Sequence, residues 1–170
     1  MSNLLYDSLF GFHVDNQKPF LIQSDGSQLS YEAFLRIASR FANTLKETGL
    51  TVGDRLAVQV EKSAEALAIY AACVQCGLIF LPLNTAYKPA EVDYFISDSG
   101  ARMLIAGDTA ALQSVAAAHD VTLHHMAADG SGSFTKLAAE ASDRFTPVPR
   151  GGNDLAALLY TSGTTGRSKG

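Results

Sequence analysis

The stretch RLAVQVEKSAEALAIYAACVQCGLIFLPL, residues 55–83, decides the fold. Its two ends, 55–60 and 78–83, are short apolar runs that predict buried strands. Residues 63–76 between them have the length of a helix and are apolar on nearly all sides, and Gly77 ends this segment. A strand, a helix and a strand of these lengths predict a right-handed βαβ crossover between parallel strands.

The same alternation continues toward the C-terminus. Lys88-Pro89 opens a helix with proline in its first turn, and this helix closes near Gly100. The remaining predicted elements are strand 101–106, helix 109–118, strand 121–126 and helix 134–141. Together they predict an α/β fold in which a mostly parallel sheet carries helices on both faces.

Upstream of this stretch, the sequence predicts a hairpin and an amphipathic helix. Residues 20–30 form the hairpin, which turns at Asp25-Gly26. Ser30 is a suitable N-cap for the helix, which ends near Gly49. Its apolar side chains recur every three or four residues and predict a surface that faces the core: Tyr31, Phe34, Leu35, Ala38, Phe41, Ala42 and Leu45.

Composition excludes several classes of protein. The 170 residues are 47% hydrophobic and 18% charged, as expected for a globular chain with one substantial core. A net charge of -4 without a long basic run argues against nucleic-acid binding. The N-terminus lacks the features of a secretory signal, and the longest apolar stretch, 64–73, is too short to cross a bilayer. With two cysteines that suit a reducing compartment, we expect a cytoplasmic location.

The cysteines and histidines are assigned to packing or to the surface. Cys73 and Cys76 form a C-x-x-C pair, but no second pair completes a zinc site, so we expect them in the core. The adjacent His124 and His125 lie in a predicted strand and should face opposite sides. No catalytic motif accompanies the four histidines, which are His13, His119, His124 and His125. We therefore predict neither a catalytic residue nor a metal ligand within these 170 residues.

The chain ends with a polar loop, YTSGTTGRSKG, residues 160–170. The apolar run 155–159 before it predicts a buried strand that leads directly into the loop. Glycine allows backbone NH groups to approach a ligand, hydroxyl groups add donors, and Lys169 adds a positive charge. The loop therefore predicts a phosphate cradle, which in a parallel sheet lies beyond the carboxyl ends of the strands. Its spacing fits neither a Walker loop nor a G-x-G-x-x-G fingerprint.

The whole string 160–170 resembles the phosphate-binding signature of the adenylate-forming enzymes, the ANL superfamily, which includes acyl-CoA synthetases and peptide synthetase adenylation domains. Ser168 stands where most members have proline, and serine there resembles the malonyl-CoA synthetases. The run Pro82-Leu83-Asn84-Thr85-Ala86-Tyr87 is similar to the same group. Less specific matches of structural type cover Leu29-Ser30-Tyr31, Gly53-Asp54-Arg55 and residues 76–84.

This resemblance implies that residues 1–170 are part of a large N-terminal adenylation domain, end within the phosphate-binding loop, and lack the C-terminal domain. It implies an AMP-forming acid–CoA ligase of fatty acid metabolism, which acts on malonate or a related small carboxylic acid. The full-length parent would use ATP, Mg²⁺ and coenzyme A. The family's acidic metal ligand, ribose-binding aspartate and C-terminal lysine are not in this chain, so we expect residues 1–170 alone to be inactive.

The resemblance also assigns roles within the loop. The implied nucleotide-binding residues are Thr161, Ser162, Thr164 and Thr165 through their hydroxyl groups, Gly163 and Gly166 through backbone NH groups, and Lys169 through its charge on the pyrophosphate.

Two other functions remain open from the sequence. One is a stand-alone nucleotide-binding or regulatory α/β module whose final loop binds phosphate without catalysis. The other is a purely structural domain in which the loop is a linker.

Overall fold

The computed structural model describes residues 2–23 and 25–161 of the chain. The helices are α1 (Leu4–Leu9), the 3-10 turn η1 (Gly11–His13), α2 (Tyr31–Glu47), α3 (Ala64–Cys76), α4 (Pro89–Ser99), α5 (Thr109–Ala118) and α6 (Ser133–Ala138). The strands are β1 (Pro19–Ile22), β2 (Gln28–Ser30), β3 (Arg55–Gln59), β4 (Ile79–Pro82), β5 (Met103–Ala106) and β6 (Thr122–His125). The elements predicted before residue 155 are all present, and their bounds differ from the predicted ones by a few residues.

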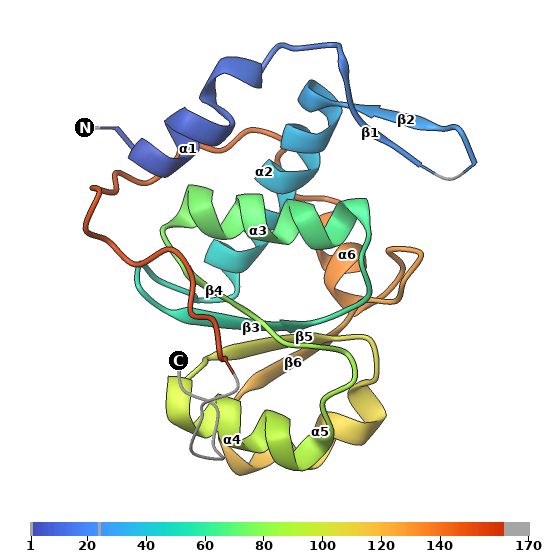
Figure 1. The fold of residues 1–170 in the computed structure, drawn as a ribbon, viewed down its shortest axis with the longest axis vertical. Coiled ribbons are helices and arrows are strands. Elements are labelled where there is room, and N and C mark those ends of the chain that lie inside the picture. Colours follow the sequence, from blue (N-terminus) through green and yellow to red (C-terminus); the bar gives the residue numbers. More distant parts are fainter. Residues whose placement is uncertain (1, 24, 162–170) are drawn as a thin grey trace.

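A four-stranded parallel sheet with the order β4-β3-β5-β6 forms the centre of the molecule (Figure 1). The chain first crosses from β3 to β4 and then returns to the other side of β3 to form β5. Strands β1 and β2 form a separate antiparallel hairpin. The α/β fold class and the parallel crossovers predicted from residues 55–83 are confirmed.

The sheet separates two apolar cores. Helices α1, α2, α3 and α6 lie on one face and helices α4 and α5 on the other (Figure 1). Side chains along β3 alternate between the two, because Leu56 and Val58 pack with the first group of helices and Ala57 packs with the second. The continuous burial of β5 follows from this arrangement, since both faces of the sheet are covered.

Local capping sets the ends of the two longest helices. The hydroxyl oxygen of Ser30 accepts a hydrogen bond from the Ala33 amide at 3.2 Å, and Ser63 caps α3 in the same way at Ala66, at 3.1 Å. Helix α3 ends at Gly77, whose φ of 68° is in the left-handed region. The chain then turns directly into β4.

The apolar run 155–159 differs from its prediction as a buried strand. It pairs with β4 only through an isolated parallel bridge between Phe80 and Ala157. Leu155 and Leu159 are 65% and 62% exposed. The apolar composition was misleading because a strand is fully buried only where other elements cover both of its faces, and among the described residues the side chains of Leu155 and Leu159 are left largely uncovered.

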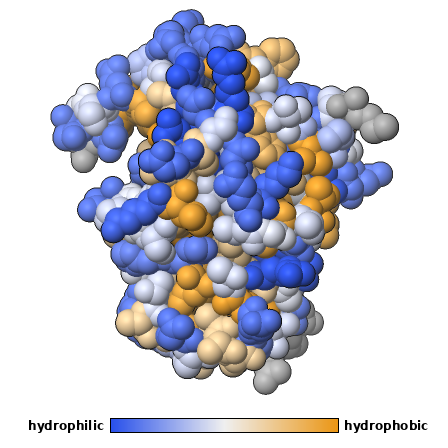
Figure 2. Space-filling model, turned by 180° about the vertical axis from the view of Figure 1, so that it is seen from behind, coloured by the Kyte–Doolittle hydropathy of each residue, from blue (hydrophilic) through white to orange (hydrophobic). Residues whose placement is uncertain are grey.

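The surface carries apolar residues in separate patches that polar side chains interrupt (Figure 2). Within residues 2–23 and 25–161, the structure contains no helix that is long and apolar enough to cross a membrane.

Candidate phosphate-binding edge of the sheet

The last described segment runs alongside β4 and in the same direction. The Phe80 amide donates to the carbonyl oxygen of Ala156 at 3.0 Å, and the Leu158 amide donates to the carbonyl oxygen of Phe80, also at 3.0 Å. Because this pairing is parallel, the segment runs in the direction in which the strands end. We call the side where β3, β4, β5 and β6 end the carboxyl edge, and it is where ligands bind in open parallel sheets. The paired residues are level with Phe80 in the first half of β4, and Tyr160 then contacts Asp98 in the last turn of α4, so the described segment is directed toward this edge without reaching it.

Thr161 is the only predicted phosphate-binding residue that the structure describes. It is exposed and follows directly from the segment paired with β4. The other predicted residues lie outside the described residues, so their roles stay predictions: Ser162, Gly163, Thr164, Thr165, Gly166 and Lys169.

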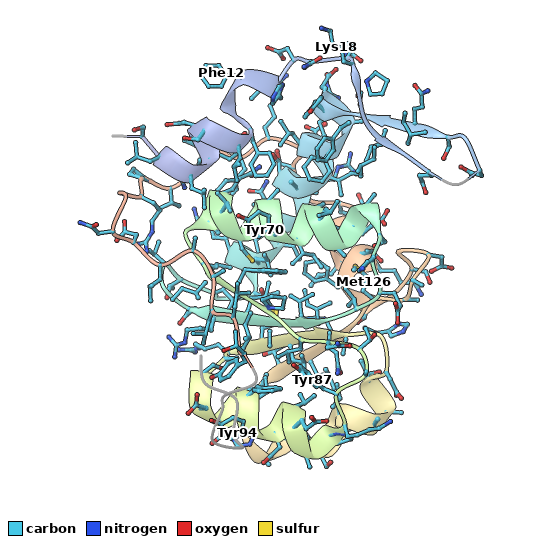
Figure 3. The ribbon with its side chains drawn as sticks, viewed as in Figure 1. Phe12, Lys18, Tyr70, Tyr87, Tyr94 and Met126 are labelled. Carbon is cyan, nitrogen blue, oxygen red and sulfur yellow. The ribbon has the colours of Figure 1, made fainter. Side chains whose placement is uncertain are left out.

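Tyr160 attaches the end of this segment to helix α4. Its ring centroid lies 4.6 Å from that of Phe95 and 6.2 Å from that of Tyr94. Its hydroxyl group donates to Asp98 Oδ2 at 2.5 Å. Tyr94 and Tyr87 lie in the same layer of the molecule as α4 (Figure 3). The residue before Thr161 is therefore held by both ring packing and a hydrogen bond.

A pocket of about 320 Å³ opens at the carboxyl edge beside the ends of β3, β5 and β6. The Gln59 amide lines it and donates to the carbonyl oxygens of Asn84 and Tyr87 at 2.8 and 3.1 Å, which closes the loop after β4. Glu61 and Asp108 contribute carboxylates to the pocket, and its described lining contains no lysine or arginine. Like charges repel, so this pocket is unsuited to phosphate.

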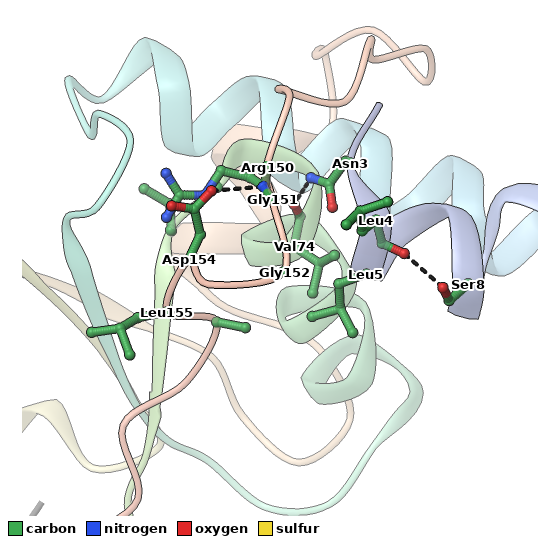
Figure 4. A pocket seen from close by; sticks show the side chains of 13 residues that line it. Asn3, Leu4, Leu5, Ser8, Val74, Arg150, Gly151, Gly152, Asp154 and Leu155 are labelled. Carbon is green, nitrogen blue, oxygen red and sulfur yellow. Dashed lines mark hydrogen bonds and ion pairs between the residues drawn. The ribbon is translucent and has the colours of Figure 1, made fainter. Parts of the chain in front are cut away.

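A second pocket, of about 380 Å³, lies away from the carboxyl edge (Figure 4). It lies between α1, the end of α3 and residues 150–156, and Gly77 and Leu78 place it near the amino end of β4. Arg150 and Asp154 form an ion pair there, with 3.5 Å between Arg150 Nε and Asp154 Oδ2. Its lining includes Leu155 and Ala156 of the segment that leads into the loop, but neither Tyr160 nor Thr161.

The two cysteines are buried and unpaired, which confirms their assignment to the core. Burial raises the pKa of the Cys76 thiol to about 12 and that of Cys73 well above its ordinary value. The Cys76 Sγ donates to the carbonyl oxygen of Ala42 at 3.3 Å. Neither thiol is therefore available as a thiolate at neutral pH.

Three of the four histidines make packing or pairing contacts. His13 stacks on Tyr31 at 4.1 Å, and His119 Nε2 lies 2.9 Å from Asp93 Oδ1. His124 lies 6.1 Å from the ring of Phe134, and burial lowers its pKa. In the part of the chain that the structure describes, no three side chains of His, Cys, Asp or Glu are grouped to hold a metal ion.

Three polar residues of structural importance were not identified from the sequence. Asn3 precedes the first helix, so its N-cap role could have been predicted from residue type. Asp98 and Gln59 carried no such signal, because their partners are 62 residues away and 25 or 28 residues away.

Comparison with known proteins identifies the family to which the chain belongs. Residues 13–170 match the family described as AMP-binding enzyme. A feruloyl-CoA synthase from an Amycolatopsis species is 34% identical over 153 residues, and the long-chain-fatty-acid–CoA ligase FadD13 of Mycobacterium tuberculosis is 30% identical over 145 residues. These alignments cover 88% and 84% of this chain.

The fold is also similar to that of a solved structure, ATP-bound MatB from Rhodopseudomonas palustris. The TM-score is 0.93 with 44% sequence identity over 99% of this chain. The chain spans 29% of the feruloyl-CoA synthase, 29% of FadD13 and 34% of MatB. The family match includes both the sheet and the predicted phosphate loop, and so this chain belongs to the AMP-binding enzyme family.

Proposed function

We propose that this chain supplies the phosphate-binding loop of an ATP-dependent acid–CoA ligase. The observation that carries the proposal is the parallel pairing of residues 156–158 with β4, which directs the chain before Thr161 toward the carboxyl edge. The loop sequence that follows lies within the family match. The alternative of a structural linker gives no reason for this sequence to follow a segment that runs toward a ligand-binding edge.

The donor set of the loop fits a polyphosphate. Hydroxyl groups and glycine NH groups are suited to phosphate oxygens, and Lys169 would neutralise charge on the departing pyrophosphate. The exposed position of Thr161 leaves its hydroxyl group open to a ligand. Magnesium would complete the neutralisation of the phosphates when it is bound. We assign no magnesium ligand and no coenzyme A contact to the described residues.

The proposed reaction has two steps. The carboxylate of the acid attacks the α-phosphorus of ATP, which forms an acyl-adenylate and releases pyrophosphate. The thiol of coenzyme A then attacks the acyl carbon, the bond to AMP breaks, and acyl-CoA is formed. In this scheme the loop acts in the first step, because it holds the β- and γ-phosphates in line with the attacking carboxylate.

We further propose malonate or a related small carboxylic acid as the substrate. The run 82–87 and Ser168 support this choice, as does the 44% identity to MatB, a malonyl-CoA synthetase. The names of other relatives refer to feruloyl-CoA and to long-chain fatty acids, so the family match alone supports the ligase chemistry and not the acid.

The test is formation of acyl-CoA and AMP by the full-length protein, with malonate, methylmalonate, acetate, ferulate and palmitate as separate substrates. We expect the highest kcat/KM with malonate. A higher value with ferulate or palmitate would overturn the choice of acid and leave the ligase proposal intact. Absence of AMP formation with every acid would contradict the proposed chemistry.

A further inference from the structure

The start of the predicted phosphate loop is attached to two different elements of the fold. Main-chain hydrogen bonds join residues 156–158 to β4 at Phe80. The Tyr160 side chain joins the next part of the chain to α4, through ring packing on Phe95 and the hydrogen bond to Asp98. A chain held only at Phe80 could rotate about the bonds after Leu158, whereas the second attachment restricts this rotation.

The hydrogen bond between Tyr160 and Asp98 has the properties of a strong contact. Its 2.5 Å length is typical of a hydroxyl group that donates to a charged carboxylate. Burial, followed by the hydrogen bond and the negative charge of Asp98, raises the pKa of Tyr160. The phenol therefore keeps its proton, and remains a donor, throughout the neutral range.

Asp98 has no visible role in the stability of α4 itself. It is exposed and lies in the last turn of the helix, which Gly100 ends with a φ of 62°. An aspartate near a helix C-terminus is unfavourable to the helix, because that end carries partial negative charge. The contact with Tyr160 is a structural explanation for a carboxylate at this position.

We propose that Asp98 and Tyr160 are positioning residues for ATP, which fix where the phosphate-binding loop begins. This inference rests on the proposed function of the loop. Neither side chain is assigned a contact with the nucleotide; both act through the backbone at Thr161. Without the hydrogen bond between these two side chains, the loop should start from several positions. Only some of these positions would allow it to bind phosphate, so the apparent affinity for ATP should fall.

The test compares variants of the full-length protein. Tyr160→Phe keeps the ring and removes the donor, Asp98→Ala removes the acceptor, and Asp98→Asn keeps a neutral acceptor. Asp93→Ala is the matched control, because Asp93 lies on the same helix and pairs instead with His119. KM for ATP and KM for the acid are measured for each variant, together with hydrogen exchange of the backbone amides after Tyr160 and the melting temperature.

We expect Tyr160→Phe and Asp98→Ala each to raise KM for ATP by about 3- to 10-fold, which is the size of effect expected for the loss of one ordinary hydrogen bond. Asp98→Asn should recover part of this loss, and the double variant should be no worse than either single one. Hydrogen exchange after Tyr160 should become faster in the same variants. KM for the acid, the melting temperature and the Asp93→Ala control should change little.

Wild-type KM for ATP and wild-type hydrogen exchange in Tyr160→Phe would overturn the inference. An equal rise in KM for ATP in the Asp93→Ala variant would also overturn it, because the effect would then come from α4 as a whole. A wild-type protein without ATP-dependent activity would refute the proposed function instead. In that case hydrogen exchange of the amides after Tyr160 still tests the attachment of Tyr160 to α4. Unchanged exchange in Asp98→Ala would refute this attachment, and faster exchange would support it.

Discussion

At the scale of single residues, Asn3 joins three distant parts of the chain. Its Nδ2 donates to the carbonyl oxygens of Val74 at 2.8 Å and Val148 at 2.9 Å. Its Oδ1 accepts from the Tyr6 amide at 3.0 Å and so caps α1. The residue is only 2% exposed, so water cannot replace these partners.

We expect Asn3→Ala to lower the free energy of unfolding by about 2–4 kcal/mol, because two buried carbonyl groups lose their donor and α1 loses its cap. Urea-induced unfolding measures this change. Ser8→Ala is the control on the same helix: its hydroxyl donates to the Leu4 carbonyl at an exposed site, and its removal should cost less than about 0.5 kcal/mol. Equal losses in both variants would contradict the role given to Asn3.

The two buried cysteines predict that stability falls at high pH. Burial raises the pKa of Cys76 from 9.0 to about 12 in the folded protein, and that of Cys73 rises as well. Above pH 9.0 the unfolded chain releases these protons while the folded chain retains them, so rising pH favours unfolding. The stabilisation is complete below pH 9.0 and is lost as the pH rises toward 12.

Unfolding free energies measured between pH 8 and 11 for wild type and for Cys73→Ala/Cys76→Ala test this expectation. The wild-type value should fall more steeply with pH, by up to about 1.4 kcal/mol per pH unit for each thiol. Parallel slopes in the two proteins would show that the thiols titrate alike in the folded and unfolded states.

The residue scale also shows where sequence reasoning ends. Serine and glycine caps such as Ser30 and Gly77 were predictable, because capping is a local property. The carbonyl partners of Asn3 are 71 and 145 positions away, and only the folded arrangement brings them together.

At the scale of elements, the turn between α3 and β4 depends on Gly77 for two separate reasons. Its φ of 68° is unfavourable for residues with a Cβ, and a Cβ there would lie 2.9 Å from Arg150 Cδ. Gly53 has a similar φ of 85° but has open space where the Cβ would be. A comparison of alanine substitutions at the two glycines therefore separates the cost of backbone strain from the cost of a steric contact.

We expect Gly53→Ala to cost about 1 kcal/mol through backbone strain alone. Gly77→Ala should cost about 2–3 kcal/mol, because the Arg150 side chain must also move. Urea-induced unfolding of both variants gives the difference. A cost for Gly77→Ala no greater than that for Gly53→Ala would show that Arg150 moves away freely.

The elements themselves differed in how well they could be predicted. Residues 55–83 carry their βαβ pattern in length and hydrophobicity, and the structure follows it. The run 155–159 has the composition of a strand, yet Leu155 and Leu159 are mostly exposed. The composition of a segment shows that its side chains are apolar enough to be buried. Whether they are buried depends on the elements that pack against the segment.

At the scale of the whole molecule, the parallel sheet sets the direction of the segment that precedes the loop sequence. All four strands end at the carboxyl edge, and residues 156–158 run alongside β4 in the same direction. The roles of loop residues 161–169 stay predictions, which rest on their own contiguous signature. The attachment of Tyr160 to Asp98 could not be predicted from the sequence, since it depends on the packing of α4 against the last described segment.

The isolated chain provides a test at this scale. We expect residues 1–170 alone to show no acid-dependent exchange of pyrophosphate into ATP, because they match only 34% of the MatB chain, and the resemblance implies that the groups for adenosine and for the metal lie outside them. The full-length protein is the positive control. Exchange by the isolated chain at a rate near that of the full-length protein would contradict this expectation.

The measurement that tests the central claim most directly is malonate-dependent exchange of pyrophosphate into ATP by the full-length protein carrying Lys169→Ala. The control is Lys136→Ala, which removes an exposed lysine from α6. A phosphate-binding loop predicts that kcat/KM for ATP falls by about 10- to 100-fold in Lys169→Ala and stays unchanged in the control. Wild-type exchange in Lys169→Ala would contradict the assignment of this loop to the phosphates of ATP.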